Sequence, residues 1–175
     1  MKQLDGTGMK RLHREWRRRT PTRLALVLDS VQTPYNVGAI VRSAAAYRVD
    51  HLWLAGSALG PDHPGVGKTA LGTDRYLRWS RVPTGPAGVE AARAEGYRVV
   101  GIELTATAVP LHQVALGDHD VCLVLGHEDH GVGPATLDAC DVVAFLPLLG
   151  RVGSLNVATA AAIACYEARR QAWPD

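Results

Sequence analysis

The sequence predicts an α/β protein in which helices cover both faces of a parallel sheet. Apolar runs of strand length alternate along the chain with stretches of helical periodicity, which is the pattern of strand–helix–strand units. Several of these runs end in polar or glycine residues, as strands do where an α/β sheet builds its binding sites. The length of 175 residues and the apolar fraction of 47% fit one domain with a sizeable core.

Each expected element has a local signal. Strands are expected at 24–28, 51–55, 76–82, 97–104, 121–125 and 142–146, and helices at 7–19, 37–47, 86–95 and 154–171. Pro86 suits a first helical turn, and Gly96 ends the same helix. Residues 57–75 are rich in glycine and proline and are expected to form a long functional loop.

Composition argues against a membrane or secreted protein. No apolar run approaches the ~20 residues that a membrane helix needs, and the N-terminus is polar and basic, unlike a secretory signal. We therefore expect a cytoplasmic protein with no membrane partner. Cys122, Cys140 and Cys165 are widely spaced in apolar surroundings, so we expect buried small hydrophobes and no disulfide framework.

Positive charge is concentrated at the N-terminus. Residues 1–23 hold eight Lys or Arg against two carboxylates, a local charge of +6, while the remainder holds 11 basic and 15 acidic residues, a local charge of −4. We expect 1–23 to be a basic arm that docks on RNA and 24–175 to be the folded domain. The arm cations expected to bind RNA are Arg11, Arg14, Arg17, Arg18 and Arg19. Trp16 favours RNA because its ring can stack on a base, and a frayed, solvated terminus is the alternative.

Three segments place polar side chains after apolar runs: 36–42 (NVGAIVR), 125–128 (LGHE) and 146–156 (LPLLGRVGSLN). Because sites in α/β proteins lie where strand ends meet helix N-termini, we expect the three segments to form one site. The candidate residues are Asn36, Arg42, Glu128, Ser154 and Asn156. Taken singly, Asn36 and Ser154 can be helix N-caps and Arg42 a surface arginine.

Two other patterns fail on their spacing. GVGKT at 65–69 has Asp62 where a phosphate-binding loop needs glycine, although Lys68 in this loop can touch a substrate phosphate. His127 and His130 are three residues apart instead of four and lie among glycines, so no metal site is expected. The first strand is not followed by GxGxxG, which disfavours an ordinary dinucleotide site.

Together, the three segments resemble the signature motifs of the SpoU-type RNA ribose 2′-O-methyltransferases, which belong to the SPOUT superfamily. The first motif covers 26–42 and includes Pro34 and Gly38, the second covers 124–128 with Gly131, and the third covers 146–156 and continues to Tyr166 and Glu167. KTALG at 68–72 also resembles a loop common in the family. The sequence of the third motif is most similar to that of the tRNA enzymes that methylate a D-loop guanosine.

The resemblance implies a deep C-terminal trefoil knot, S-adenosylmethionine as the cofactor and a homodimer that completes the active site. It places the cofactor in the knot, held mainly by backbone around Leu104, Gly126, Leu146 and Leu155. The alanine-rich helix at 154–171 offers small residues for close helix packing, either to a second copy or to its own sheet.

The resemblance also implies roles for the candidate residues. Asn36 and Glu128 would organise the site, while Ser154 and Asn156 would shape the third loop. Arg42 would act on the ribose, as an electrostatic and phosphate-orienting group, because a guanidinium rarely gives up its proton.

The expected activity is 2′-O-methylation of a ribose in structured RNA, most specifically a D-loop guanosine of tRNA. An rRNA substrate is the nearest alternative. A non-catalytic RNA-binding protein that keeps the fold and a phosphohydrolase built on residues 65–69 are further alternatives.

Overall fold

The computed structural model describes residues 3–173, which form one seven-stranded sheet with the strand order β3-β2-β1-β6-β4-β7-β5. All pairings are parallel. The strands are β1 (Leu24–Asp29), β2 (His51–Ala55), β3 (Arg78–Val82), β4 (Arg98–Ile102), β5 (Val109–Pro110), β6 (Val121–Leu125) and β7 (Val142–Phe145). The predicted parallel sheet is confirmed.

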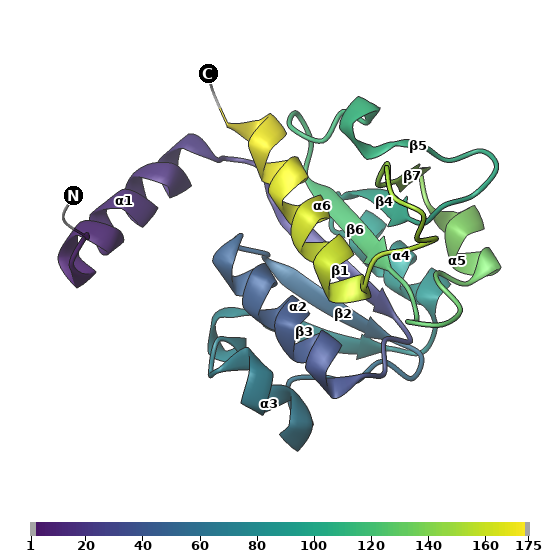
Figure 1. Ribbon diagram of the computed structural model, residues 1–175, viewed down its shortest axis with the longest axis horizontal. Helices are drawn as coiled ribbons and strands as arrows, with labels where there is room; N and C mark the ends of the chain where they lie inside the picture. The colour runs from purple at the N-terminus through teal and green to yellow at the C-terminus, as the bar shows by residue number, and fades with distance from the viewer. Residues whose placement is uncertain (1–2, 174–175) are drawn as a thin grey trace.

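Helices cover both faces of this sheet, as predicted (Figure 1). They are α1 (Gly6–Arg19), α2 (Pro34–Ala46), α3 (Pro64–Ala70), α4 (Gly85–Ala94), α5 (Pro134–Ala139) and α6 (Val157–Ala172). Alternate residues of β1 face opposite sides: Leu26 packs in the cluster with α2, α3 and α6, and Val27 packs in the cluster with α4. No helix within residues 3–173 is long and apolar enough to cross a bilayer.

Two helices, α2 and α6, begin three residues away from the expected positions, whereas α1 and α4 begin within one residue of them. α2 begins at Pro34, three residues early, because proline lacks the N–H that a first helical turn leaves unpaired. α6 begins at Val157, three residues late, because the side chain of Asn156 accepts hydrogen bonds from the N–H groups of Ala158 and Thr159. Ser154 is therefore not the N-cap of α6.

The expectation of a long loop at 57–75 is wrong, because this segment contains α3. Its glycine-rich sequence has low helix propensity, and packing against α2 stabilises it instead. Gly38 of α2 makes the close approach possible, since a Cβ there would lie 2.6 Å from Thr69 Cβ and 2.8 Å from the Val66 carbonyl. GVGKT lies within this helix, so the phosphohydrolase alternative loses its support. The short elements α5 and β5 were also not expected.

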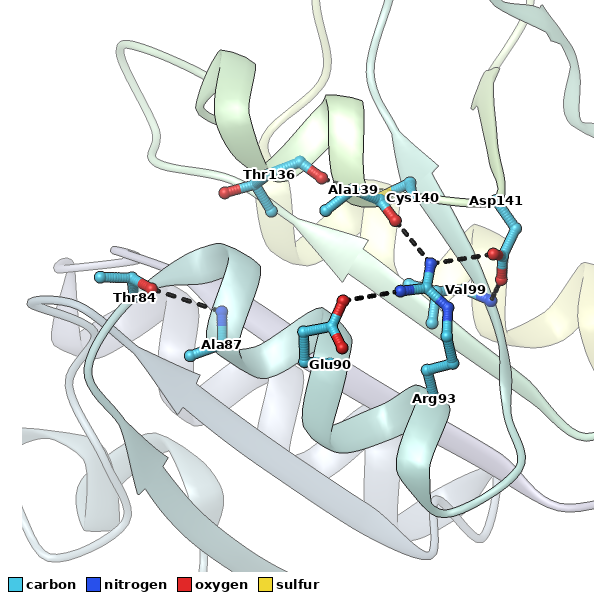
Figure 2. Close-up of polar contacts among 9 residues, drawn as sticks. All are labelled: Thr84, Ala87, Glu90, Arg93, Val99, Thr136, Ala139, Cys140 and Asp141. Carbon is cyan, nitrogen blue, oxygen red and sulfur yellow. Dashed lines mark hydrogen bonds and ion pairs between the residues drawn. The ribbon is translucent and has the colours of Figure 1, made fainter.

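Arg93 joins α4 to the C-terminal part of the sheet (Figure 2). Its guanidinium donates to the Ala139 carbonyl at 2.7 Å and to Asp141 at 2.9 Å. The other carboxylate oxygen of Asp141 accepts from the Val99 N–H at 2.7 Å. These contacts hold the end of α5 and the start of β7 against β4 and α4.

Arg169 of α6 is a buried cation whose partners are all backbone carbonyls. It donates to Thr22 at 2.7 Å, to Tyr47 at 2.8 Å and to Arg48. One side chain thus connects the entry to β1, the end of α2 and the last helix.

The predicted basic helix at the N-terminus is confirmed as α1, which has no buried residue. The chain joins the folded domain at Arg23, whose side chain and N–H both bind the Asp120 carboxylate, at 2.7 and 2.6 Å. Its guanidinium also lies 4.5 Å from the ring centroid of Tyr97.

Candidate active site

A cavity of about 600 Å³ opens beyond the carboxyl ends of β4, β6 and β7; we call it the strand-end cavity. Its walls come from the loops after these strands and from the first turn of α6. The four residues expected to hold a cofactor all line it: Leu104, Gly126, Leu146 and Leu155. Glu128 and Ser154 line it as well.

Three candidate residues are joined in a hydrogen-bonded chain, Glu128–Asn36–Asn156. The Asn36 amide donates to Glu128 Oε1 at 2.9 Å, and the Asn156 amide donates to Asn36 Oδ1 at 2.9 Å. Asn36 is buried, and it is the third residue of α2, so it is not the N-cap. The three motif segments, remote in sequence, therefore meet at one point.

Glu128 also binds the start of α2. Its two oxygens accept from the N–H groups of Thr33 at 2.9 Å and Gln32 at 3.2 Å. Partial burial opposes ionisation, but the hydrogen bonds from Asn36, Thr33 and Gln32 outweigh it and lower the pKa of Glu128 to about 2. The carboxylate is therefore charged at neutral pH, where it also complements the positive end of the helix dipole.

Asn156 has two structural roles at the other end of this chain. Its carbonyl oxygen caps α6 while its amide reaches Asn36. Because one side chain makes both contacts, the position of the third-motif loop is coupled to the start of α6. Ser154 is exposed at the cavity wall, two residues before this cap.

Arg42 does not reach the strand-end cavity of its own chain. It lies six residues after Asn36 on α2, which places it roughly 9 Å farther along the axis and about 240° around it. Asn36 faces the buried network, whereas Arg42 is exposed. Among residues 3–173, no hydrogen bond or ion pair engages its guanidinium.

The sequence reasoning missed Glu103, which shapes the second-motif loop. Its carboxylate accepts from the Val132 N–H at 3.0 Å and from the Leu104 N–H at 3.0 Å. A Cβ at Gly131, where φ is +68°, would collide with this carboxylate. The expected strand at 97–104 included Glu103, whereas β4 ends at Ile102, so a carboxylate near the end of an apolar run was the available signal.

The second-motif loop is a tight turn. His127 and Gly131 exchange two backbone hydrogen bonds of 2.9 Å, and the rings of His127 and His130 stack with centroids 4.8 Å apart. Gly126 lies so close to the backbone of Gly131 and Val132 that a Cβ would not fit. Within residues 3–173, no group of three potential ligands is positioned to hold a metal ion.

The cations expected to bind RNA do not form one cluster. Arg11, Arg14, Arg17, Arg18 and Arg19 are exposed on α1, and Arg19 pairs with Glu15 at 2.8 Å. Lys68 is exposed on α3, which lies apart from α1 in Figure 1.

A cavity at the carboxyl ends of a parallel sheet, bordered by a carboxylate–amide network, defines an α/β enzyme domain of the open-sheet type. Residues 23–166 match the family model described as "SpoU rRNA Methylase family". The chain belongs to this family, which confirms the resemblance seen in the sequence.

The relatives of this chain are RNA methyltransferases by name. A 23S rRNA (guanosine-2′-O-)-methyltransferase from Coxiella burnetii is 35% identical and matches 89% of this chain and 61% of its own length. AviRb from Streptomyces viridochromogenes, a SpoU methyltransferase solved in complex with AdoMet, is 31% identical with a TM-score of 0.76, covering 88% of this chain and 63% of AviRb.

A second solved structure, described by "the 2-OH methylation of C/U34 on tRNA", is 28% identical with a TM-score of 0.75 and covers 86% of this chain and 97% of that one. By contrast, the chain spans about six-tenths of the length of several curated relatives that it matches.

Proposed function

We propose that this chain uses S-adenosylmethionine to methylate the 2′-hydroxyl of a ribose in structured RNA. The observation that carries the proposal is the strand-end cavity with the Glu128–Asn36–Asn156 chain at its side, because all three motif segments converge there. Family membership and the names of the relatives support the same activity.

The lining of the strand-end cavity fits this cofactor. Leucine and phenylalanine side chains give apolar walls for an adenine ring, and the loops after three strands bring peptide groups that can pair with polar edges. When bound, the cofactor would supply the electrophilic methyl group.

The protein contributes mainly by positioning the reactants. A ribose 2′-hydroxyl is a weak nucleophile that must approach the methyl group in line, so orientation supplies a large part of the rate. Glu128, Asn36 and Asn156 hold the loops that form the cavity, and Ser154 shapes its wall. Arg42 stabilises the developing negative charge on the ribose oxygen and orients a neighbouring phosphate.

Substitution of Arg42 by lysine distinguishes a need for positive charge from a need for the planar guanidinium. Near-full turnover in Arg42→Lys would show that positive charge suffices, whereas a collapse would show that the planar guanidinium is needed. Arg78→Ala, at an exposed arginine of the edge strand β3, is the matched control and should leave turnover unchanged.

We further propose a homodimer in which Arg42 of one subunit serves the strand-end cavity of the other. Arg42 lies outside its own cavity, and Ile163 and Tyr166 of α6 leave apolar surface exposed. Ala158, Ala161 and Ala164 pack on the chain's own sheet, so only the outer side of α6 is offered to a second copy.

Subunit mixing tests this shared site. Arg42→Ala and Asn156→Ala dimers should each be inactive, and mixing them should restore about a quarter of wild-type activity, because half of random dimers combine the two variants and each such dimer has one intact site. Two inactive variants that stay inactive after verified subunit exchange would show that each cavity uses its own Arg42.

For the RNA, we propose tRNA, with a D-loop guanosine as the most specific target. The sequence of the third motif supports the D-loop guanosine. Solved relatives described as acting on tRNA support tRNA as the substrate but not this nucleotide, since one of them is described for C/U34. Ribosomal RNA is the alternative, because several curated relatives are named for 23S rRNA. The trefoil knot and the cytoplasmic location stay predictions.

The decisive test is transfer of a labelled methyl group from S-adenosylmethionine to purified tRNA and, separately, to rRNA. Nuclease resistance of the modified linkage maps the product. Label in one RNA, lost in Arg42→Ala, would support the enzyme and identify its substrate class. Cofactor binding without transfer to either RNA would instead support a non-catalytic RNA-binding protein.

A further inference from the structure

A second cavity, of about 510 Å³, lies where α1 meets the ends of α2 and α6; we call it the helix-end cavity. Its lining consists of His13, Trp16 and Arg17 of α1, Thr20 directly after that helix, residues 45–48, Tyr76, Arg169 and Trp173. Figure 1 shows α1 leaving the sheet beside the C-terminal end of α6. The helix-end cavity shares no lining residue with the strand-end cavity.

Aromatic rings form much of this cavity and hold one another in place. The Trp16 and Trp173 ring centroids are 5.0 Å apart, and Tyr166 contacts Trp173 at 5.7 Å and Tyr47 at 6.3 Å. Trp16 nevertheless keeps 41% of its surface exposed, and Tyr76 keeps 65%. Rings that are fixed but accessible are the arrangement on which unpaired bases stack.

The charge at the helix-end cavity is positive. Arg17 and Arg48 are exposed beside the rings, and the Arg48 guanidinium donates to the Arg17 carbonyl at 3.4 Å, which keeps the two segments together. The third arginine, Arg169, is already engaged by three carbonyls. Among the described lining residues none is acidic. The cavity therefore favours a ligand with a flat apolar part and negative charge.

We propose that the helix-end cavity binds an unpaired nucleotide of the RNA substrate, with its base against Trp16 and its phosphate at Arg17 and Arg48. The inference rests on the proposed function for the class of ligand and adds an RNA contact away from the reaction site. A nucleotide fits better than an apolar protein segment, because arginine, histidine and threonine interrupt the aromatic walls.

Anisotropy titrations with fluorescein-labelled unfractionated tRNA, and separately with fragmented rRNA, test the contact at several salt concentrations. For whichever RNA binds, Trp16→Ala should weaken the affinity by roughly 5- to 100-fold. It should not change the slope of log binding constant against log salt concentration (the salt slope), because stacking releases no counterions. Trp16→Phe should restore most of the affinity. Arg17→Ala should lower the salt slope by about 1. Leu12→Ala, at another exposed apolar residue of α1, is the matched control and should bind like the wild type.

Photocrosslinking of the bound RNA separates a direct contact from an indirect effect on α1. Crosslinks in peptides that contain Trp16, Tyr76 or Trp173 support the inference. Crosslinks only elsewhere, wild-type affinity in Trp16→Ala, or no binding of either RNA would overturn it. A change in sedimentation of Trp16→Ala with unchanged RNA affinity would assign the cavity to a contact between copies and also overturn it.

The two proposals fail in different ways. Crosslinking at Trp16 without methyl transfer would refute the proposed activity and leave the nucleotide site standing. Methyl transfer with wild-type RNA affinity in Trp16→Ala would refute the nucleotide site alone.

Discussion

Glu128→Gln should destabilise the protein in a way that depends on pH. The substitution keeps the size of the side chain but removes the charge that accepts from Gln32, Thr33 and Asn36. A pKa of about 2 in the folded state, against about 4.3 in an unfolded chain, corresponds to about 3 kcal/mol at most, which solvent screening reduces to about 1–2 kcal/mol. The amide also has only one acceptor oxygen, so one N–H loses its partner at a cost of about 1 kcal/mol. The expected loss is about 2–3 kcal/mol at pH 7.

The pH dependence follows from the lowered pKa of Glu128. Because the folded-state pKa lies below the unfolded value, the carboxylate stabilises the fold fully above about pH 5 and loses this effect as the pH falls toward 2. The charge-dependent part of the difference in unfolding free energy between the wild type and Glu128→Gln should therefore be about halved at pH 3. Urea denaturation at a fixed protein concentration measures both values.

Asp129→Asn is the matched control, because Asp129 is an exposed neighbour on the same loop. It should change the free energy of unfolding by less than about 0.5 kcal/mol. A free energy of unfolding for Glu128→Gln within about 0.5 kcal/mol of the wild-type value at pH 7 would refute the role given to the Glu128 charge. It also fails if the gap between the two proteins is as large at pH 3 as at pH 7.

Further predictions concern packing and buried charge. Arg169→Met should lower the free energy of unfolding, measured by urea denaturation, by about 3 kcal/mol, because three carbonyls lose a buried donor. Arg170→Met, at an exposed residue one position away, should lower it by less than about 1 kcal/mol. Equal losses in the two variants would contradict the role given to Arg169. Gly38→Ala should lower stability by about 1–3 kcal/mol, since its Cβ would meet α3. Gly67→Ala, where a Cβ meets open space, should be neutral or stabilising by up to about 1 kcal/mol; a loss in Gly67→Ala as large as that in Gly38→Ala would show that glycine matters here for another reason.

The elements with strong local signals were predictable from the sequence. The apolar run of β1 and the alternation of strands and helices indicated the sheet, and the family resemblance implied that Leu104 and Leu155 belong to one site. Helix α3 was not predictable, because its stability depends on contact between Gly38 and Thr69 across the chain. Local propensity carries no record of such a contact.

The hydrogen bonds within the site and the orientation of its side chains could not be predicted from the sequence. Asn36 was expected as a helix cap or a site residue and Asn156 as a residue that shapes the third loop, and only the fold shows that Asn156 donates to Asn36. The orientation of Arg42 away from its own cavity depends on where α2 begins and which side it buries. The motifs thus indicated which residues lie near one another, but the start of α2 and its packing determine the direction in which their side chains point.

The buried guanidinium of Arg169 has a consequence for how the chain folds. Its partner Thr22 lies 147 residues earlier, and Arg23 finds its own partner, Asp120, 97 residues later. Contacts of such sequence separation carry a high cost in loop closure and form late and slowly. During synthesis, β1 emerges long before the strand and the arginine that complete its surroundings. Early intermediates therefore expose the apolar strands of the sheet centre, and aggregation should compete with folding until the last helix arrives.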